Sequence, residues 1–408
     1  MNFCETDLEA FVAESDRLGG PGAPGCDAYW AGFTYQPTFQ VDQALDPFSD
    51  AYVDAQLTLY AEISGRAFDQ NQNEQAAFDV APYAAAVNPY NHPDPSVLAL
   101  HLRRLTKAIH LAGVNRGDHL LDMGCGWGLS SEIAAYSGLQ VTAVDINPGF
   151  VELVNTRAAR LGWDIKAELG TFDDFKPAAP VDMVLFYECL HHALRPWTVL
   201  ERLAGSLVMP AGRIVLAGEP INATWWEHWG LRLDALSVYC IRKFGWFESG
   251  WSLEFIRAVF HRCGLSLQVA EDSDATVGYT LIGRMNQIET MTGDVFLARN
   301  ESSGFITEGL YGILSDRGWI EVVFPENAIR AQIALLNVRA SPLKLRLTSG
   351  TTVLMDGEIP NGQTKVVLTR TTPSVRLEFE AETWVPDSEL ANGDLRDLSL
   401  HLAEVCFS

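Results

Sequence analysis

Apolar and polar positions follow three different patterns along the chain, and each pattern predicts a different kind of unit. Between about residues 119 and 285, short and almost wholly apolar segments are separated by stretches with helical spacing. The segments that read as strands are His119–Asp122, Gln140–Asp145, Ile165–Glu168, Val181–Tyr187, Arg213–Ala217, Ser266–Ala270 and Tyr279–Gly283. Apolar strands that alternate with helices are typical of a parallel sheet covered on both faces. We therefore expect a doubly wound, seven-stranded α/β domain over residues 96–285.

The part before this domain has mainly helical spacing. A helical stretch runs from Asp7 to Leu18, and a second apolar pattern of the same period runs from Asp46 to Gly65. Prolines then interrupt the pattern up to the main domain. We expect residues 1–95 to form a helical cap or lid. Tyr90 and His92, in the loop before the main domain, are predicted to shield the reactive site from water, with plain surface positions as the alternative.

Beyond about Phe305 the period changes to two. Leu343–Leu347, Val375–Phe379 and Leu398–Leu402 alternate apolar with polar residues, and turn signals such as Asn361-Gly362 lie between such segments. Short alternating strands at regular spacing predict a β-sandwich over residues 305–408.

Charge and composition narrow the range of partners. The chain of 408 residues has 52 acidic and 29 basic residues, a net charge of −23. Such a surface repels phosphate backbones, so we expect no nucleic-acid partner. No apolar run is long enough to span a bilayer, and the N-terminus lacks the features of a signal peptide, so we expect no membrane insertion and a cytoplasmic location. The seven cysteines are scattered without a C-x-x-C pair and indicate neither a disulfide framework nor a cysteine zinc site.

A glycine-rich turn follows the first strand of the α/β domain. Gly124, Gly126 and Gly128 have G-x-G-x-G spacing, and Asp122 precedes the first glycine by two positions. Glycines at such a turn let a ligand approach the backbone. An acidic residue so close would repel a pyrophosphate, which favours S-adenosylmethionine over a dinucleotide. Asp145 ends the second strand, about twenty residues after the turn, where it can accept hydrogen bonds from ribose hydroxyls.

The segment 119–219 resembles the class I S-adenosylmethionine-dependent methyltransferases, which have a Rossmann-like fold. The motifs that carry this resemblance are Leu120–Gly128, Val141–Asp145 and Val184–Glu188. The resemblance implies that the first two glycines line the methionine part of the cofactor and that residues near Thr171 flank the adenine, although a threonine there departs from the aspartate common in the family. The residues that we expect at the cofactor are Asp122, Gly124, Cys125, Gly126, Gly128, Asp145, Ile146, Thr171, Phe172 and Tyr187.

Three side chains after the fourth strand are candidates for catalysis. Glu188, His191 and His192 follow the carboxyl end of that strand, where ligands of open α/β sheets bind. Methyl transfer to a hydroxyl needs a base, and histidine suits that task near neutral pH. We expect one of the two histidines to be the base and Glu188 to orient it or the substrate. A structural cap on the following helix is the alternative for either histidine.

The same spacing resembles the Glu-x-x-Glu-His pattern of methyltransferases of ubiquinone biosynthesis, which implies a divalent metal held by Glu188 and His192. Here His191 replaces a carboxylate, so the resemblance does not favour a magnesium site.

An aromatic-rich insertion at about residues 219–250 follows the fifth strand, where methyltransferases commonly build the acceptor pocket. Aromatic faces beside charged groups suit a sugar ring, whose C–H face packs on the aromatic ring while its hydroxyls bind the polar groups. The residues that we predict at the substrate are Glu219, Trp226, His228, Trp229, Arg232 and Asp234, together with Tyr90 and His92. A core or a homo-oligomer contact made of tryptophans is the alternative.

A run from Gly218 to Trp246 resembles bacterial methyltransferases associated with cell-surface polysaccharide and glycosyltransferase loci. We therefore predict an O-methyltransferase that acts on a sugar hydroxyl, in a glycan, a glycolipid or an activated sugar. The first alternative is a methyltransferase of a phenol, an amine or a lipid. The second is a non-catalytic carbohydrate-binding or assembly protein.

Overall fold

The computed structural model describes residues 2–208, 211–272, 274–285, 305–308, 311–314, 317–323, 329–372, 374–385 and 399–407. The chain divides into two compact units. The predicted cap, residues 1–95, belongs to the first unit, and the chain from Leu281 onward belongs to the second. Among the helices that the structure describes, none combines the length and the hydrophobicity needed to cross a membrane.

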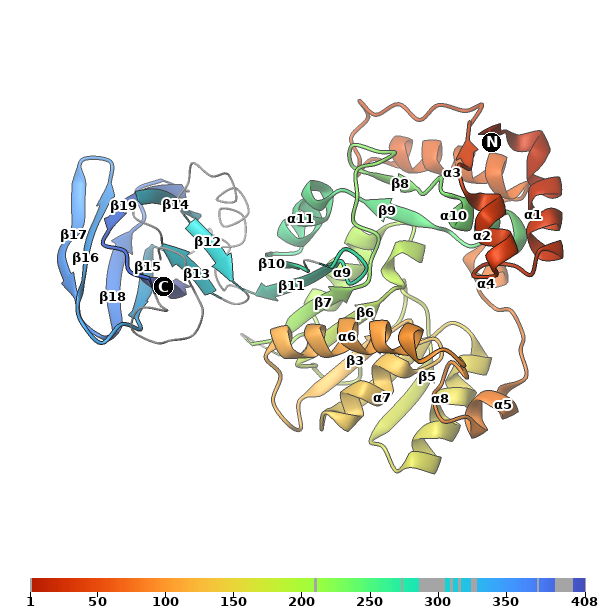
Figure 1. Ribbon diagram of the computed structural model, residues 1–408, viewed down its shortest axis with the longest axis horizontal. Coiled ribbons are helices and arrows are strands. Elements are labelled where there is room, and N and C mark those ends of the chain that lie inside the picture. Colours follow the sequence, from red (N-terminus) through yellow and green to blue (C-terminus); the bar gives the residue numbers. More distant parts are fainter. Residues whose placement is uncertain are drawn as a thin grey trace. The chain divides into compact units, whose positions relative to one another are not determined.

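A mixed seven-stranded sheet forms the centre of the α/β part (Figure 1). Its strand order is β10-β11-β7-β6-β3-β4-β5, and the five strands from β7 to β5 pair in parallel. The strands are β3 (His119–Met123), β4 (Gln140–Asp145), β5 (Ile165–Leu169), β6 (Met183–Tyr187), β7 (Arg213–Ala217), β10 (Leu265–Glu271) and β11 (Tyr279–Met285). The apolar character of β6 and β7 follows from their position, because every residue of both strands is buried. The predicted seven-stranded sheet is confirmed.

Helices flank this sheet (Figure 1). They are α6 (Pro95–Ala112), α7 (Leu129–Tyr136), α8 (Pro148–Leu161), α9 (Pro196–Ala204) and α11 (Leu253–Arg262). Local chemistry fixes their ends. Asn147 caps α8 by accepting a hydrogen bond from the amide of Gly149, and Gly162, with φ +70°, ends the same helix in the left-handed conformation that glycine adopts without strain.

The N-terminal helices pack on the insertion that follows β7. The elements before α6 are β1 (Asn2–Phe3), α1 (Leu8–Arg17), α2 (Pro24–Trp30), β2 (Thr34–Tyr35), α3 (Asp50–Ser64), α4 (Gln70–Asn73) and α5 (Val80–Ala85), and the insertion contains β8 (Trp229–Leu231), α10 (Ala235–Phe244) and β9 (Ser249–Trp251). Tyr52 of α3 donates a hydrogen bond to the carbonyl of Trp229 at 2.6 Å, and Tyr60 donates one to the carbonyl of Gly245 at 2.6 Å. Trp229 and Trp251 are completely buried, so this part of the insertion is core.

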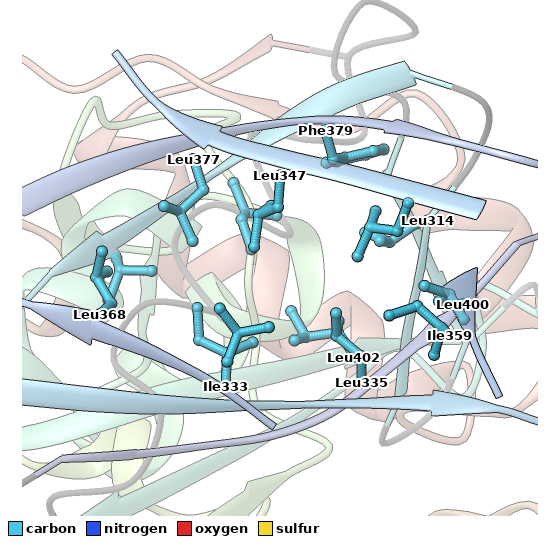
Figure 2. Close-up of a cluster of buried hydrophobic side chains, with 14 of the residues drawn as sticks. Leu314, Ile333, Leu335, Leu347, Ile359, Leu368, Leu377, Phe379, Leu400 and Leu402 are labelled. Atoms are coloured by element: carbon cyan, nitrogen blue, oxygen red, sulfur yellow. The ribbon is translucent and has the colours of Figure 1, made fainter. Parts of the chain in front are cut away.

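The described part of the chain from Phe305 onward, within the second unit, forms two antiparallel sheets consistent with the predicted β-sandwich. Its sheets have the strand orders β12-β13-β20-β15-β18 and β14-β19-β16-β17. The strands are β12 (Phe305–Glu308), β13 (Tyr311–Leu314), β14 (Arg317–Val323), β15 (Arg330–Asn337), β16 (Leu343–Ser349), β17 (Thr352–Ile359), β18 (Gly362–Thr369), β19 (Ser374–Ala381) and β20 (His401–Phe407). Figure 2 shows Leu347 and Leu377 of one sheet pointing toward Ile333, Leu335 and Leu368 of the other. The last strand begins at His401, later than predicted, and Leu398 of the predicted strand lies outside the described residues.

A buried arginine ties the N-terminal segment to the α/β domain. The side chain of Arg157 in α8 is fully buried, and its Nε lies 2.5 Å from a carboxylate oxygen of Glu132 in α7. Its Nη1 donates to the carbonyls of Tyr83 at 2.9 Å and Ala86 at 2.8 Å. The guanidinium therefore holds α5 against α7 and α8.

Arg157→Met should strongly destabilise the first unit. The substitution leaves the Glu132 carboxylate without its ion-pair partner and removes the Arg157 hydrogen bonds to the carbonyls of Tyr83 and Ala86, and breaking a buried ion pair in this way costs about 3–5 kcal/mol. Urea unfolding followed by circular dichroism measures the change. Arg160→Met is the matched control, because Arg160 is exposed on the same helix and should cost about 1 kcal/mol or less. Equal stability of the two variants would contradict this role for Arg157.

Candidate functional site

A cavity of about 450 Å³ opens at the carboxyl ends of the parallel strands. This is the edge at which open α/β sheets bind ligands, and the volume is in the range of small-molecule sites. The residues that line it are Gln70, Glu74, Ala76, Ala77, Phe78, Met123, Gly124, Gly126, Trp127, Val144, Asp145, Ile146, Asn147, Phe150, Gly170, Thr171, Phe172, Glu188, Cys189, His192, Phe244 and Trp246. Ends of β3, β4 and β6 thus meet here with the N-terminal segment 70–78 and the end of α10.

The glycine turn after β3 forms one wall of the cavity. At Gly124, with φ +70°, a Cβ would lie 2.9 Å from the Sγ of Cys189, so the turn admits no side chain there. At Gly126, with φ +48°, nothing lies within 4 Å of a Cβ position, so this backbone borders open space. Both glycines line the cavity, as predicted for a ligand that lies directly against the turn.

Asp145 lies at the end of β4, beside the glycine turn. One carboxylate oxygen accepts a hydrogen bond from the amide of Gly126 at 2.8 Å, and the other accepts one from the amide of Asn147 at 2.8 Å. Burial raises the pKa of Asp145, while these two hydrogen bonds act in the opposite direction. Each oxygen keeps further acceptor capacity toward the cavity, so the carboxylate can still bind hydroxyl groups.

Asp122 has a different position from the one predicted. It is fully buried beneath the turn and accepts hydrogen bonds from the hydroxyls of Ser130 at 2.7 Å and Ser131 at 2.5 Å. Burial raises its pKa to about 6. Asp122 therefore fastens the first turn of α7 to β3 and lies outside the cavity lining, as do Cys125 and Gly128.

Of the other residues expected at the cofactor, Ile146, Thr171 and Phe172 line the cavity, whereas Tyr187 does not. Thr171 donates its hydroxyl to Asp174 at 2.6 Å, which fixes the loop after β5. Tyr187 points instead toward α6, where its hydroxyl lies 2.5 Å from Nδ1 of His101.

Glu188 reaches the cavity from a strained backbone. Its φ of +51° places a non-glycine residue in the left-handed region, which costs energy and is common at functional sites. Its carboxylate pairs with Arg104 of α6, and His101 lies 3.5 Å away. Burial raises the pKa of Glu188 to about 7, against the opposing effect of the Arg104 charge.

The two predicted catalytic histidines have different surroundings. His191 is buried, and its Nδ1 lies 2.9 Å from a carboxylate oxygen of Glu219. His192 lines the cavity, and its Nδ1 lies 3.7 Å from a carboxylate oxygen of Glu74. Of the two rings, that of His192 is thus the one that faces a ligand in this cavity.

Glu219 fixes the backbone of the loop after β6, which carries Glu188, His191 and His192. The carboxylate accepts hydrogen bonds from the backbone amides of Cys189 and Leu190 at 2.9 Å and from that of His191 at 3.2 Å. Although burial opposes ionisation, the charge of His191 and these hydrogen bonds lower the pKa of Glu219. Glu219 was predicted at the substrate, and the structure places it behind the cavity wall.

The other predicted substrate residues also lie outside the cavity lining. Trp226 donates its ring N–H to the carbonyl of Leu231 at 2.7 Å, and Trp229 donates its own to the carbonyl of Pro47 at 2.8 Å. Asp234 caps α10. His228, Arg232, Tyr90 and His92 lie outside the lining as well, and His92 accepts a hydrogen bond from the amide of Asp94.

The segment 70–78 and several aromatic residues line the cavity without having been predicted. Phe78 packs on Trp127 with ring centroids 4.8 Å apart, and Phe244 stacks on Trp246 at 4.7 Å. Asn147 donates to the carbonyl of Ala76 at 2.9 Å, which ties the segment to the end of β4. Trp127 lies inside the glycine turn and Phe244 and Trp246 lie in the aromatic-rich insertion, so the sequence offered a signal for these three residues but none for segment 70–78.

Comparison with known proteins agrees with this geometry. Residues 120–209 match the family described as "Methyltransferase domain". The chain is 31% identical over 143 residues to a ubiquinone biosynthesis O-methyltransferase of Xanthomonas euvesicatoria pv. vesicatoria, covering 33% of this chain and 58% of the relative. It is 37% identical over 103 residues to the enzyme with the same name of Caulobacter sp., covering 25% of this chain and 40% of that protein. The match therefore spans less than two thirds of these relatives.

Solved structures include a SAM-dependent methyltransferase from Aquifex aeolicus, with a TM-score of 0.36 and 18% identity, covering 51% of this chain and 97% of that one. The segment 120–209 that matches the methyltransferase domain family includes the glycine turn after β3 and the strands β4 and β6. Residues 120–209 are therefore similar to the methyltransferase domain family and to part of these O-methyltransferases.

Proposed function

We propose that the chain is an O-methyltransferase that transfers the methyl group of S-adenosylmethionine to a hydroxyl of a small molecule, with a sugar as the acceptor. The observation that carries this proposal is one cavity in which the glycine turn and Asp145 lie together with Glu188 and His192. The glycine turn and Asp145 are suited to binding the methyl donor. Glu188 and His192 offer groups that can accept a proton.

The residues of the cavity fit S-adenosylmethionine better than a dinucleotide. Gly126 borders open space, and Asp145 offers a carboxylate for ribose hydroxyls. Within the described part of the chain, the residues that line the cavity include Glu74, Asp145 and Glu188 but no lysine or arginine. Such a site repels a diphosphate and attracts a cation. When bound, the donor supplies a methyl group on a positively charged sulfur, which a nucleophile displaces in line.

His192 is the better candidate for the base of the two predicted histidines. It lines the cavity, whereas His191 is enclosed between Glu219 and Glu248. A hydroxyl placed against His192 would lose its proton to the ring as its oxygen attacks the methyl carbon. Glu188 lines the same cavity and is suited to hold the acceptor in position.

A sugar acceptor is supported by the stacked rings of Phe244 and Trp246 beside polar groups. The aromatic faces can pack on the C–H face of a sugar, while Gln70 and Glu74 provide hydrogen-bond partners for its hydroxyls. A phenolic acceptor is the second candidate, favoured by the relatives named as ubiquinone biosynthesis O-methyltransferases.

Assays with labelled S-adenosylmethionine and matched panels of sugars, sugar nucleotides and phenols should separate these candidates. We expect labelled product from the sugar panel, with a kcat/KM at least about tenfold above that of any phenol, because a pocket built to bind several hydroxyls discriminates against an acceptor that has fewer of them. Methyl transfer to phenols alone would show that the acceptor is a phenol and would contradict a sugar acceptor. Transfer to neither panel, with the cofactor bound, would oppose both.

Asp145→Asn should weaken cofactor binding. The substitution removes the negative charge that accepts the ribose hydroxyls, and a hydrogen bond to a charged group contributes about 1.5–3 kcal/mol, or roughly a 10- to 100-fold change in Kd. Calorimetry with S-adenosylhomocysteine measures the effect. Asp164→Asn, at an exposed position before β5, should bind like the wild type. If the two variants bind equally well, Asp145 is not a cofactor residue.

His192→Gln should lower kcat by about 10²- to 10⁴-fold, the usual contribution of a general base. The Kd for S-adenosylhomocysteine should not change, which separates catalysis from folding and from cofactor binding. His110→Gln, at an exposed position of α6, is the control and should retain full turnover. Wild-type turnover by the His192 variant would remove this residue from the mechanism.

A further inference from the structure

A cluster of imidazole and carboxylate groups lies beside the cavity. One ring nitrogen each from His191 and His192 and one carboxylate oxygen of Glu248 lie within 4.8 Å of one another. Nε2 of His191 is 3.6 Å from Glu248, and Nδ1 of His192 is 3.7 Å from Glu74. Ligands of one metal ion at about 2.1 Å lie roughly 3–4 Å apart, so these separations are close to those of a metal site.

The orientation of the two rings supports metal binding. Nδ1 of His191 lies 2.9 Å from Glu219, which leaves Nε2 on the side of Glu248. A carboxylate that holds one nitrogen of a histidine while the other binds a metal is a common arrangement. Nδ1 of His192 is buried and has no hydrogen-bond partner in the part of the chain that the structure describes. Such a nitrogen needs a partner, and a cation would supply it.

The charges of the cluster also favour a divalent cation. Three carboxylates, those of Glu74, Glu219 and Glu248, lie beside the two histidines, and Glu248 pairs with Arg232 at 3.3 Å. One guanidinium against three carboxylates leaves an excess of two negative charges in a largely buried region.

We propose that His191, His192 and Glu248, with Glu74 as a fourth ligand, bind one divalent transition-metal ion such as Zn²⁺. Two imidazoles with carboxylates suit zinc and similar ions, whereas Mg²⁺ prefers oxygen ligands. The ion would join the loop after β6 to the insertion and to segment 70–78, and so fix one wall of the cavity. With the ion bound, His192 is a ligand and cannot act as the base proposed above, so Glu188, which lines the same cavity, is the group that would accept the proton in the metal-loaded protein.

This ligand set differs from the pair indicated by the sequence. Glu188 faces Arg104 and His101 of α6, so its carboxylate is engaged apart from the cluster. Glu248 takes its place, from a position 60 residues later in the chain that the local motif does not include.

Metal titration of the untagged, chelator-treated full chain tests the proposal without a turnover assay. We expect calorimetry to show one Zn²⁺ per chain, and Co²⁺ at the same site to give a visible spectrum of nitrogen and oxygen ligands without the thiolate charge-transfer band that Cys189 would produce. Mg²⁺ should bind far more weakly. Glu248→Gln and Glu74→Gln should each weaken Zn²⁺ binding by at least about tenfold.

Glu254→Gln is the matched control, because Glu254 is exposed in the first turn of α11 and should bind Zn²⁺ like the wild type. Circular dichroism of the metal-free variants shows whether each is folded, and if Glu248→Gln is not, Glu74→Gln decides. Absence of a one-to-one Zn²⁺ site, or equal affinity in the wild type and both ligand variants, would overturn the proposal. Because no cofactor or acceptor is present, a negative result leaves the proposed methyl transfer unaffected, whereas a positive result excludes His192 as its base.

Discussion

The carboxylate of Glu219 organises the loop on which the chemistry of the cavity depends. It accepts hydrogen bonds from three consecutive backbone amides, those of Cys189, Leu190 and His191, and from the ring of His191. A buried carboxylate with several donors is stable as an anion and holds its partners rigidly. Glu188 and His192, at the two ends of this loop, therefore reach the cavity from a fixed backbone, and the strained conformation of Glu188 persists because its surroundings determine it.

The acceptor side of the cavity is assembled from parts that are distant in the sequence. The tyrosines of α3 hydrogen-bond to carbonyls of the insertion, and Asn73 donates to the hydroxyl of Tyr60 at 3.0 Å. These contacts place the end of α10, with Phe244 and Trp246, opposite segment 70–78. Trp226 and Trp229, which suggested a sugar pocket in the sequence, do not line the cavity. Trp229 is buried in the core that supports this wall.

The sequence predicts the sheet well because strands that are buried on both faces consist almost wholly of apolar residues. The turn at Gly124 and Gly126 is equally clear, since positive φ angles and close approach leave few residues other than glycine. The position of Asp122 was not predictable in the same way, because its partners Ser130 and Ser131 face it only after α7 has folded onto β3. Segment 70–78 lacks any periodic pattern, and Glu248 joins His191 only through tertiary structure.

The acidic side chains that line the cavity would affect both the binding of the proposed methyl donor and the release of its product. Glu74, Asp145 and Glu188 line it, and the chain as a whole carries a net charge of −23. S-adenosylmethionine has a positive sulfur, and the faces of Phe78 and Trp127 provide further attraction for a cation. Methyl transfer turns the sulfonium into a neutral thioether and removes that part of the attraction. In the proposed reaction, the carboxylates and rings that attract the donor would hold its product less tightly, so that the loss of the positive charge would favour exchange of product for new donor.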